Sequence, residues 1–348
     1  MDQMEKDLIF TRHVKERKEE PMANMQDVAK LANVSVTTVS RVINNRKYVN
    51  EETKQIVLEA IQALDYVPNE LARSFYYNSS KMIGLLIYDL KNDFYNQFIT
   101  RIESQLIEKG YSLMIGTTQG NPERETYFFN LFLANNIDGV ILCTNLCTQG
   151  PLLQKVLKLP LVSVGRVLSD EVSSVSADNT SGGQLAAQIL SQNCCREILF
   201  INGPKTLHSV QEKSAGFYQV MDQYPEIHVH EVILDFVNVT QTSFDQLFRQ
   251  WPSIDGIFAA SDFLAACALR SLHSLDKKVG EAIQVIGYEN TNVCLCTSPL
   301  LSSIARPLEE MVDWTTQLLF QEVQGDKTAP RHVLLKNSFV PRETTQWK

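Results

Sequence analysis

The stretch NVSVTTVSRVINN, residues 33–45, places two kinds of side chain on opposite sides of one helix. Its apolar residues recur at the three- and four-residue spacing of an amphipathic helix: Val36, Val39, Val42 and Ile43. The residues between them are short hydroxyls and one arginine, Arg41. Because β-branched residues are only moderate helix formers, we expect this helix to depend on packing through its valine side.

The segment before this stretch predicts a second, shorter helix. Residues 27–32 are amphipathic, and residues 33–34 make a tight turn. Ser35 is placed to cap the next helix, which runs to about Ile43. Two helices joined by so short a turn form a helix-turn-helix, whose second helix lies in the major groove of DNA.

A third helix follows Asn50, which is its predicted N-cap. Glu51 and Glu52 lie in its first turn, where acidic side chains are stabilised by the helix dipole. We expect its apolar residues to face a small core: Ile56, Val57, Ala60, Ile61 and Leu64.

The polar side of the second helix has residue types suited to DNA. Thr37 and Thr38 can donate to bases or phosphates, Val36 can contact a thymine methyl group, and Arg41 can fork onto guanine. The alternative is an ordinary small helical core whose threonines face water. The order of helix, turn, helix and third helix favours DNA recognition.

Composition sets limits on the class of protein. The 348 residues are 44% hydrophobic with a net charge of −8, which allows two or three domains and a local DNA-binding module. The seven cysteines include no CxxC, so we expect free thiols in a reducing cytoplasm, no metal and no cofactor. We see no secretion signal and no apolar run of the ~20 residues that span a membrane, so we expect a cytoplasmic protein without membrane association.

Residues 1–21 alternate charges without an apolar period, and we expect them to be disordered. Lys18, Glu19 and Glu20 are what a purine-rich ribosome-binding site would encode if it were translated. We therefore expect Met22 to be the natural start, which the intact mass of the native protein would test.

After Lys81, buried-strand runs alternate with amphipathic helical runs. The runs form two series, IDGVILCTN in the first resembling IDGIFAASD in the second. The last helix covers residues 308–323, and the chain then returns through HVLLKNSFVPRETT, so we expect several crossings between lobes. Such alternation predicts an α/β core of two doubly wound lobes with parallel sheets, and a ligand cleft beyond the carboxyl ends of the strands.

Long parts of the chain resemble the LacI/GalR family of bacterial transcription regulators. The headpiece resemblance lies in MQDVAKLANVSVTTVSRVINN and VNEETKQIVLEAIQALDYVPNELARS. It continues through IGLLIYDLKNDFYNQF, DGVILCTN, GYE and FVPRETT, almost everything from Met22 on. The chain looks most like ribose operon repressors, notably in VNEETK, NELARS and the spacing of Gly203 to Phe217.

The resemblance implies a homodimer that represses transcription from a pseudo-palindromic operator. It also implies a hinge helix after Pro68 that folds on DNA, with Phe75 as a wedge in the minor groove or as a contact to the partner hinge. The implied DNA-binding residues are Ser35, Val36, Thr37, Thr38, Ser40, Arg41, Asn44, Tyr48, Asn69, Ala72 and Phe75. The implied parts are a leader (1–21), a helix-turn-helix headpiece (22–67), a hinge helix and linker (68–80) and a two-lobed, periplasmic-binding-protein-like core that binds ligand and dimerises (81–348).

The family's ligand positions imply a small-molecule effector, such as ribose, bound between the lobes. The positions that match are Phe94, Tyr95, Asn145, Arg166, Ser209, Gln211, Lys213, Phe236, Ser261, Asp262, Glu289 and Arg306. We expect the effector to release the operator.

Several of these positions depart from the sugar-responsive pattern. Lys213 stands where arginine is usual, Gly165 where aspartate is usual, and Glu289 where many relatives have aspartate. Arg166 and Arg306 add cations, which favours an acidic or phosphorylated effector. The alternative is that both arginines form salt bridges at the rim of the cleft.

Other classes of protein fit less well. The chain has no GxGxxG after a strand, no P-loop, no HExxH and no GxSxG, so we do not expect an enzyme. A regulator that answers to a partner protein stays open as an alternative. Since no heptad helix follows RETTQWK, we expect a dimer and not a tetramer.

Overall fold

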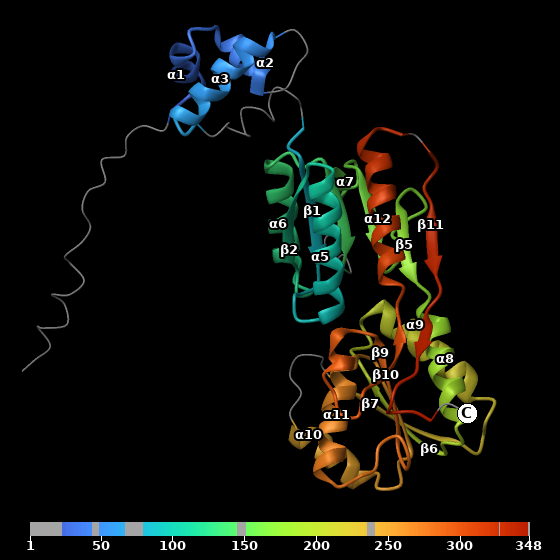
Figure 1. Ribbon diagram of the computed structural model, residues 1–348. Coiled ribbons are helices and arrows are strands. Elements are labelled where there is room, and N and C mark those ends of the chain that lie inside the picture. The colour runs from blue at the N-terminus through green and yellow to red at the C-terminus, as the bar shows by residue number, and fades with distance from the viewer. Residues whose placement is uncertain are drawn as a thin grey trace, which may run out of the picture. The chain divides into compact units, whose positions relative to one another are not determined.

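A computed structural model describes residues 23–43, 49–66, 79–144, 151–234, 241–326 and 328–346. The chain divides into two compact units, residues 1–78 and residues 79–348 (Figure 1). The predicted DNA-binding residues Asn44, Tyr48, Asn69, Ala72 and Phe75, with Asn145 and Phe236 of the predicted effector site, lie outside the described residues.

The headpiece consists of α1 (Met25–Leu31), α2 (Val36–Ile43) and α3 (Glu51–Ala63). The first helix begins two residues earlier than the sequence suggested, because Asn24 and Asp27 cap it reciprocally. The predicted caps of the other two helices are confirmed: Ser35 Oγ accepts from Thr38 N at 3.1 Å, and Asn50 accepts from Thr53 N at 2.7 Å.

A small apolar core holds the headpiece together. It contains Val28, Ala29, Ala32, Val39, Val42, Val57, Ala60 and Tyr66. The prediction for Ile56 was wrong, since its side chain is 43% exposed. Val57 and Ala60 mark the inner face of α3, and Ile56, one residue and about 100° away from Val57, points outward.

The first lobe of the core is built on a parallel sheet in the order β11-β5-β4-β3-β1-β2. The strands are β1 (Met82–Ile87), β2 (Ser112–Thr117), β3 (Gly139–Cys143), β4 (Leu161–Val164), β5 (Ser173–Ala177) and β11 (His332–Leu335). One face is covered by α5 (Asp93–Glu108) and α12 (Leu308–Val323), and the other by α6 (Pro122–Ala134) and α7 (Pro151–Val156).

The second lobe has a sheet in the order β12-β10-β9-β8-β6-β7, in which β12 alone is antiparallel to its neighbour. The strands are β6 (Glu197–Asn202), β7 (His228–Ile233), β8 (Gly256–Ala259), β9 (Gln284–Glu289), β10 (Ser302–Ala305) and β12 (Ser338–Val340). The helices are α8 (Asn179–Gln192) and α9 (His208–Met221) on one face, and α10 (Gln241–Gln250) and α11 (Asp262–Ser274) on the other.

The chain crosses between the lobes three times, as the late return of the sequence predicted. The crossings join β5 to α8, β10 to α12, and β11 to β12 (Figure 1). Because all three connections are short, residues beside them lie close to both lobes.

Candidate effector site and DNA-binding face

The described residues of α2 divide into a packed side and an exposed side. Val39 and Val42 are buried, whereas Val36, Thr37 and Arg41 are exposed. Thr38 is half-buried, and its hydroxyl lies 2.9 Å from that of the exposed Ser35, so this pair also stabilises the helix start. Ser40 is half-buried and has contacts of its own. The exposed side therefore offers an apolar, a hydroxyl and a guanidinium group to a DNA groove.

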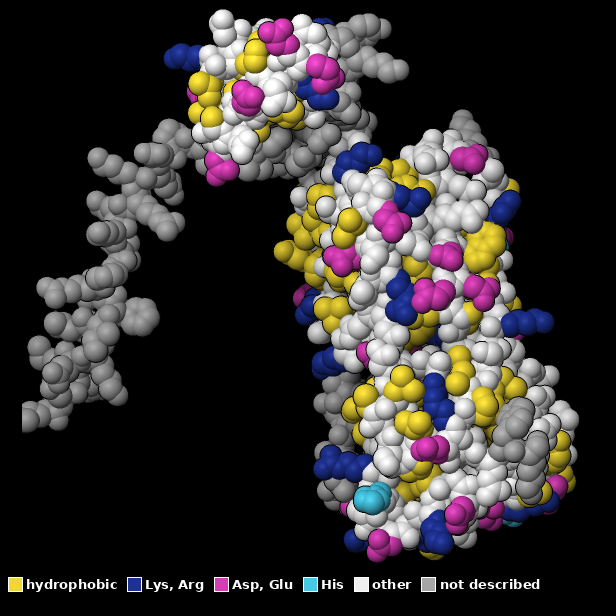
Figure 2. Space-filling view, viewed as in Figure 1, with side chains coloured by type: hydrophobic (Ala, Val, Ile, Leu, Met, Phe, Trp, Pro, Cys, Tyr) yellow, Lys and Arg dark blue, Asp and Glu magenta, His cyan; other side chains and the backbone are white. Residues whose placement is uncertain are grey.

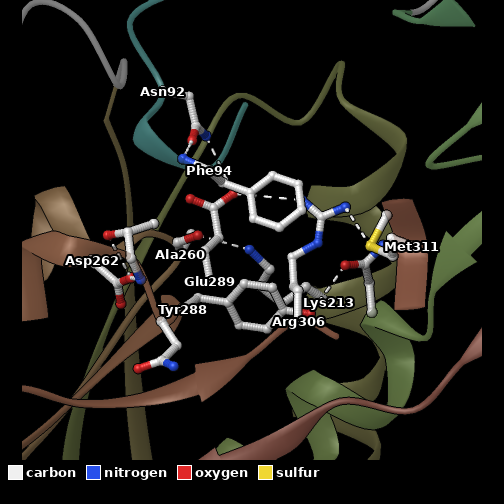
Figure 3. A network of polar contacts seen from close by, with 12 residues as sticks. Asn92, Phe94, Lys213, Ala260, Asp262, Tyr288, Glu289, Arg306 and Met311 are labelled. Carbon is white, nitrogen blue, oxygen red and sulfur yellow. Dashed lines mark hydrogen bonds and ion pairs between the residues drawn. The ribbon is translucent and has the colours of Figure 1, made fainter. Parts of the chain in front are cut away.

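A buried polar cluster lies where the two lobes of the core meet. It brings together Phe94 at the start of α5, Lys213 on α9, Glu289 at the end of β9 and Arg306 on the crossing from β10 to α12 (Figure 3). All four were among the predicted effector residues. They come from both lobes and from a segment that joins the lobes, so a molecule bound here would contact both lobes.

Arg306 lies between an aromatic ring, a carboxylate and a thioether. Its side chain is 8% exposed, and its guanidinium carbon lies 3.7 Å from the centre of the Phe94 ring. Nη1 is 3.7 Å from Oε1 of Glu289, and Nη2 is 3.9 Å from the sulfur of Met311. The salt bridge that the sequence analysis gave as an alternative for Arg306 is therefore present, but it is buried.

Lys213 is buried beside it. Its ammonium donates to the carbonyl of Ala260 at 2.7 Å and lies 3.6 Å from the centre of the Tyr288 ring. Burial lowers the pKa of Lys213 to about 7, against the opposing effect of Glu289. Close packing of α8 and α9 sets its position, because a Cβ at Gly216 would lie only 1.9 Å from the carbonyl oxygen of Thr180.

Glu289 is the carboxylate that both cations face. Burial raises its pKa to about 7, while Arg306 and Lys213 act in the opposite direction. Oε1 accepts a hydrogen bond of 3.2 Å from Asn92 of the first lobe. Its φ of 98° is unusual for a residue with a side chain, and such backbone strain is common at functional sites.

Asp262 and Ser261 have structural partners that account for their polar atoms. Asp262 Oδ2 accepts from the backbone N–H and the hydroxyl of Thr291, at 2.6 and 3.0 Å, and Oδ1 accepts from Ser303 at 2.6 Å. Ser261 caps α11 through a 3.3 Å bond from Leu264 N. These contacts fix the ends of β8 and β10 and position the cluster.

The remaining described positions lie in different surroundings. Tyr95 packs edge-on against Phe94 with 5.7 Å between ring centres, and burial raises the pKa of its phenol to about 12. Gln211 is exposed and donates to the carbonyl of Lys205 at 2.7 Å, so it turns toward its own lobe's loop. Ser209 and Arg166 are half-buried.

Sequence reasoning missed residues that contact the cluster and hold it in place, namely Tyr288 beside Lys213 and Asn92 beside Glu289. Tyr288 donates from its hydroxyl to Asn179 at 3.0 Å and accepts from Asn337 at 2.8 Å. Those two partners lie at the crossings from β5 to α8 and from β11 to β12. Asn92 was missed too, although an asparagine directly before a predicted helix start is a readable cap signal.

Two family profiles match the chain. Residues 24–69 match the family described as "Bacterial regulatory proteins, lacI family", and residues 83–327 match a "Periplasmic binding protein domain". The chain belongs to the LacI family. It is a DNA-binding transcriptional repressor with an effector-responsive α/β core, and the predicted fold class is confirmed.

Relatives of this LacI-family protein extend over nearly its whole length. The ribose operon repressor of Halalkalibacterium halodurans is 32% identical over 93% of this chain and 98% of the relative. The ribose operon repressor of Bacillus subtilis is 33% identical over 93% and 99%. A solved "transcriptional regulator CelR-cellobiose complex" has a TM-score of 0.66 and 27% identity, covering 92% of this chain and 99% of that one.

The described part of this LacI-family chain adds two negative findings. None of its helices is both long enough and apolar enough to cross a membrane. None of its groups of histidine, cysteine, aspartate and glutamate is arranged to hold a metal ion.

Proposed function

We propose that this LacI-family repressor acts in the cytoplasm as a homodimer on a pseudo-palindromic operator and releases it when a small molecule binds between the lobes. The observation that carries the proposal is the buried cluster at the lobe interface, joined to a headpiece whose recognition helix has an exposed polar side. The first effectors to test are sugars, because the relatives named above include ribose operon repressors.

The DNA-binding part of the proposal rests on α2. Thr37 and Arg41 are exposed on the side opposite Val39 and Val42, and Val36 is exposed at the start of the helix. A helix placed by its N-terminal end in the major groove presents such side chains to base edges. The hinge residues Asn69, Ala72 and Phe75 are proposed as minor-groove contacts from the resemblance alone.

Dimerisation is supported by apolar side chains on one edge of the first lobe. Ile107 on α5, Ile115 on β2 and Tyr127 on α6 are 63%, 37% and 62% exposed. In Figure 2 hydrophobic side chains gather along this edge of the upper lobe, where Figure 1 draws α6 and β2. An edge strand with apolar neighbours is a surface that proteins usually cover.

Sedimentation can test this surface directly. Tyr127→Glu is expected to shift the protein from dimer toward monomer, because it buries a charge in the proposed interface. Leu334→Glu, on β11 at the opposite edge of the same sheet and 65% exposed, is the matched control and should leave the dimer intact.

The switch is a difference in affinity between two lobe arrangements. An effector that binds one arrangement better than the other shifts the population toward it. Lobe closure at this site is supported by two hydrogen bonds between the lobes: Asn92 donates to Glu289 at 3.2 Å, and Asn292 N donates to Asp93 at 3.2 Å.

Fluorescence anisotropy on a labelled operator from the protein's own promoter tests the proposal at fixed salt. We expect tight, salt-sensitive binding that Arg41→Gln weakens more than Lys54→Gln, a matched loss of charge on α3. Binding without sequence preference would overturn the proposal that this protein recognises an operator. If no metabolite changes operator affinity unless a second protein is present, the regulator answers to a partner protein instead.

A further inference from the structure

The strongest unexplained feature of the lobe interface is a buried guanidinium that lacks close acceptors among the residues that the structure describes. Arg306 carries five N–H donors on a side chain that is 8% exposed. Within the described part of the chain, the carboxylate oxygen paired with it is 3.7 Å away, too far for a good hydrogen bond, and a thioether sulfur lies at 3.9 Å. Among the described residues, its buried Nε has no hydrogen-bond partner. Burying a cation in this state is unfavourable unless something else satisfies it.

The described carboxylates around Arg306 do not balance the basic side chains there. Lys213 and Arg306 are both buried, and Glu289 is the carboxylate that faces both of them. Asp262 is near enough to influence them, but its oxygens already accept three hydrogen bonds from Thr291 and Ser303. The described part of the cluster therefore has two basic side chains against one carboxylate with remaining acceptor capacity.

The aromatic face that would suit a neutral sugar is already covered. The guanidinium carbon of Arg306 lies over the Phe94 ring, 3.7 Å from its centre, and Figure 3 shows both groups close to Glu289. A neutral ring on this face would have to displace the guanidinium from its aromatic partner, and although its hydroxyls can accept hydrogen bonds, it brings no negative charge. An anion would supply Arg306 with both acceptors and a negative charge.

We propose that the effector carries an anionic group, a phosphate or a carboxylate, which binds between Arg306 and Lys213 and takes the place of Glu289 as their counter-ion. This inference rests on the proposed function, since it names the ligand class of the same cleft. Arg306 suits the role because its planar fork matches both kinds of oxyanion. The strained backbone at Glu289, with φ of 98°, fits a carboxylate that exchanges partners on binding.

Calorimetric titration of the full-length protein tests the ligand class with defined probes. The probes are D-ribose, D-ribose 5-phosphate, D-gluconate and inorganic phosphate, each at the same ionic strength. We expect ribose 5-phosphate or gluconate to bind at least about tenfold more tightly than ribose, because charge-assisted hydrogen bonds are the strong ones. The two anions distinguish a phosphate from a carboxylate.

Two substitutions in contact with each other should act in opposite directions. Arg306→Gln should weaken binding of the anionic probe by about tenfold or more, since it removes the guanidinium that would hold the anion. Glu289→Gln should strengthen binding of the same probe, since it removes the carboxylate that competes with the probe for Arg306 and Lys213. The matched control is Arg249→Gln, which removes an exposed arginine at the end of α10. It should leave the affinity for the anionic probe unchanged. If Arg306→Gln does not fold by circular dichroism, Lys213→Gln replaces it.

The outcomes separate this inference from the proposed function. Ribose binding more tightly than both organic anions, or no anionic probe binding, overturns the anion site. Equal losses in Arg306→Gln and Arg249→Gln also overturn it, since they reveal only long-range charge. Operator binding, measured by anisotropy without any ligand, tests the proposed repressor separately. The repressor proposal can therefore hold even if the anion-site proposal fails.

Discussion

Asn92 of the first lobe donates a hydrogen bond of 3.2 Å from Nδ2 to Oε1 of Glu289 in the second lobe. Its own Oδ1 accepts from the backbone N–H of Phe94 at 2.8 Å and so caps α5. One side chain therefore starts the helix that presents Phe94 and also ties that helix to the opposite lobe. A change that preserves the cap and removes the donor isolates the contact between lobes.

Asn92→Asp is such a change. Aspartate is as good an N-cap as asparagine, but it places an acceptor against Glu289. We expect a loss of about 1–3 kcal/mol in the free energy of unfolding at pH 8, where both carboxylates are ionised. The loss should shrink at pH 6, because the pKa of Glu289 is raised to about 7 and a protonated Glu289 can donate.

Urea unfolding of the core measures this effect against Asn121→Asp. Asn121 caps α6 by accepting from Glu123 N at 2.7 Å, and it is exposed. The control should change stability little at either pH. Equal effects of the two substitutions would show that the bond between Asn92 and Glu289 contributes nothing.

Tyr288→Phe tests the connection between the cluster and the crossings. The ring that lies under Lys213 is kept, but the hydroxyl that bonds to Asn179 and Asn337 is lost. Since Tyr288 is 1% exposed, these partners lose a buried hydrogen bond, and we expect a destabilisation of about 1–3 kcal/mol by thermal unfolding.

Tyr111→Phe is the matched control for the loss of a tyrosine hydroxyl. The Tyr111 hydroxyl accepts from the ammonium of Lys81 at 3.2 Å, and an exposed lysine can turn to water instead. If Tyr111→Phe costs as much as Tyr288→Phe, the hydroxyl of Tyr288 has no special role at the crossings.

Many helices and strands were predicted correctly from the sequence, because apolar periodicity is a local signal. Residues 308–323 were predicted as a helix and form α12 with the same bounds. The strand β5 and helix α8 were missed, since SSVSA is rich in serine and NTSGGQLAAQILSQ begins with polar residues and two glycines. Those glycines allow the close approach to α9, a tertiary requirement that weakens the helical pattern. The helix α10 was missed as well.

The residues of the candidate site were predictable from the sequence, but the contacts between their side chains were not. The resemblance to LacI/GalR regulators placed Phe94, Lys213, Glu289 and Arg306 together, and the structure brings them into contact or close range. The stacking of Arg306 on Phe94 joins residues far apart in the chain, which no local pattern encodes. Whether these residues bind an effector stays a prediction.

The pH dependence of stability should report on Glu289. Its pKa rises from the ordinary 4.5 to about 7 on folding, so between these values the folded protein holds a proton that the unfolded chain has released. Stability from this group is therefore complete below pH 4.5 and falls as the pH rises through 7. Its contribution is at most about 1.4 kcal/mol per pH unit.

Urea unfolding of Glu289→Gln at pH 5.0 to 7.0 checks this sign. The parent should lose stability over this range by more than the variant does, because glutamine has no proton to release. Lys213, whose pKa is lowered to about 7, acts above this window and with the opposite slope. Identical slopes in the two proteins would contradict a raised pKa at Glu289.

Ser35 and Thr37 should separate the stability of the headpiece from DNA recognition. Ser35 caps α2 through Thr38 N, whereas Thr37 is exposed on the same helix. Ser35→Ala should therefore destabilise the headpiece by about 1 kcal/mol. Thr37→Ala should leave thermal unfolding unchanged and weaken operator binding by anisotropy several-fold, because it removes a group from the proposed DNA face. A Thr37→Ala protein that binds operator as the parent does would leave α2 as a structural helix, and the recognition surface would have to be sought elsewhere on the headpiece.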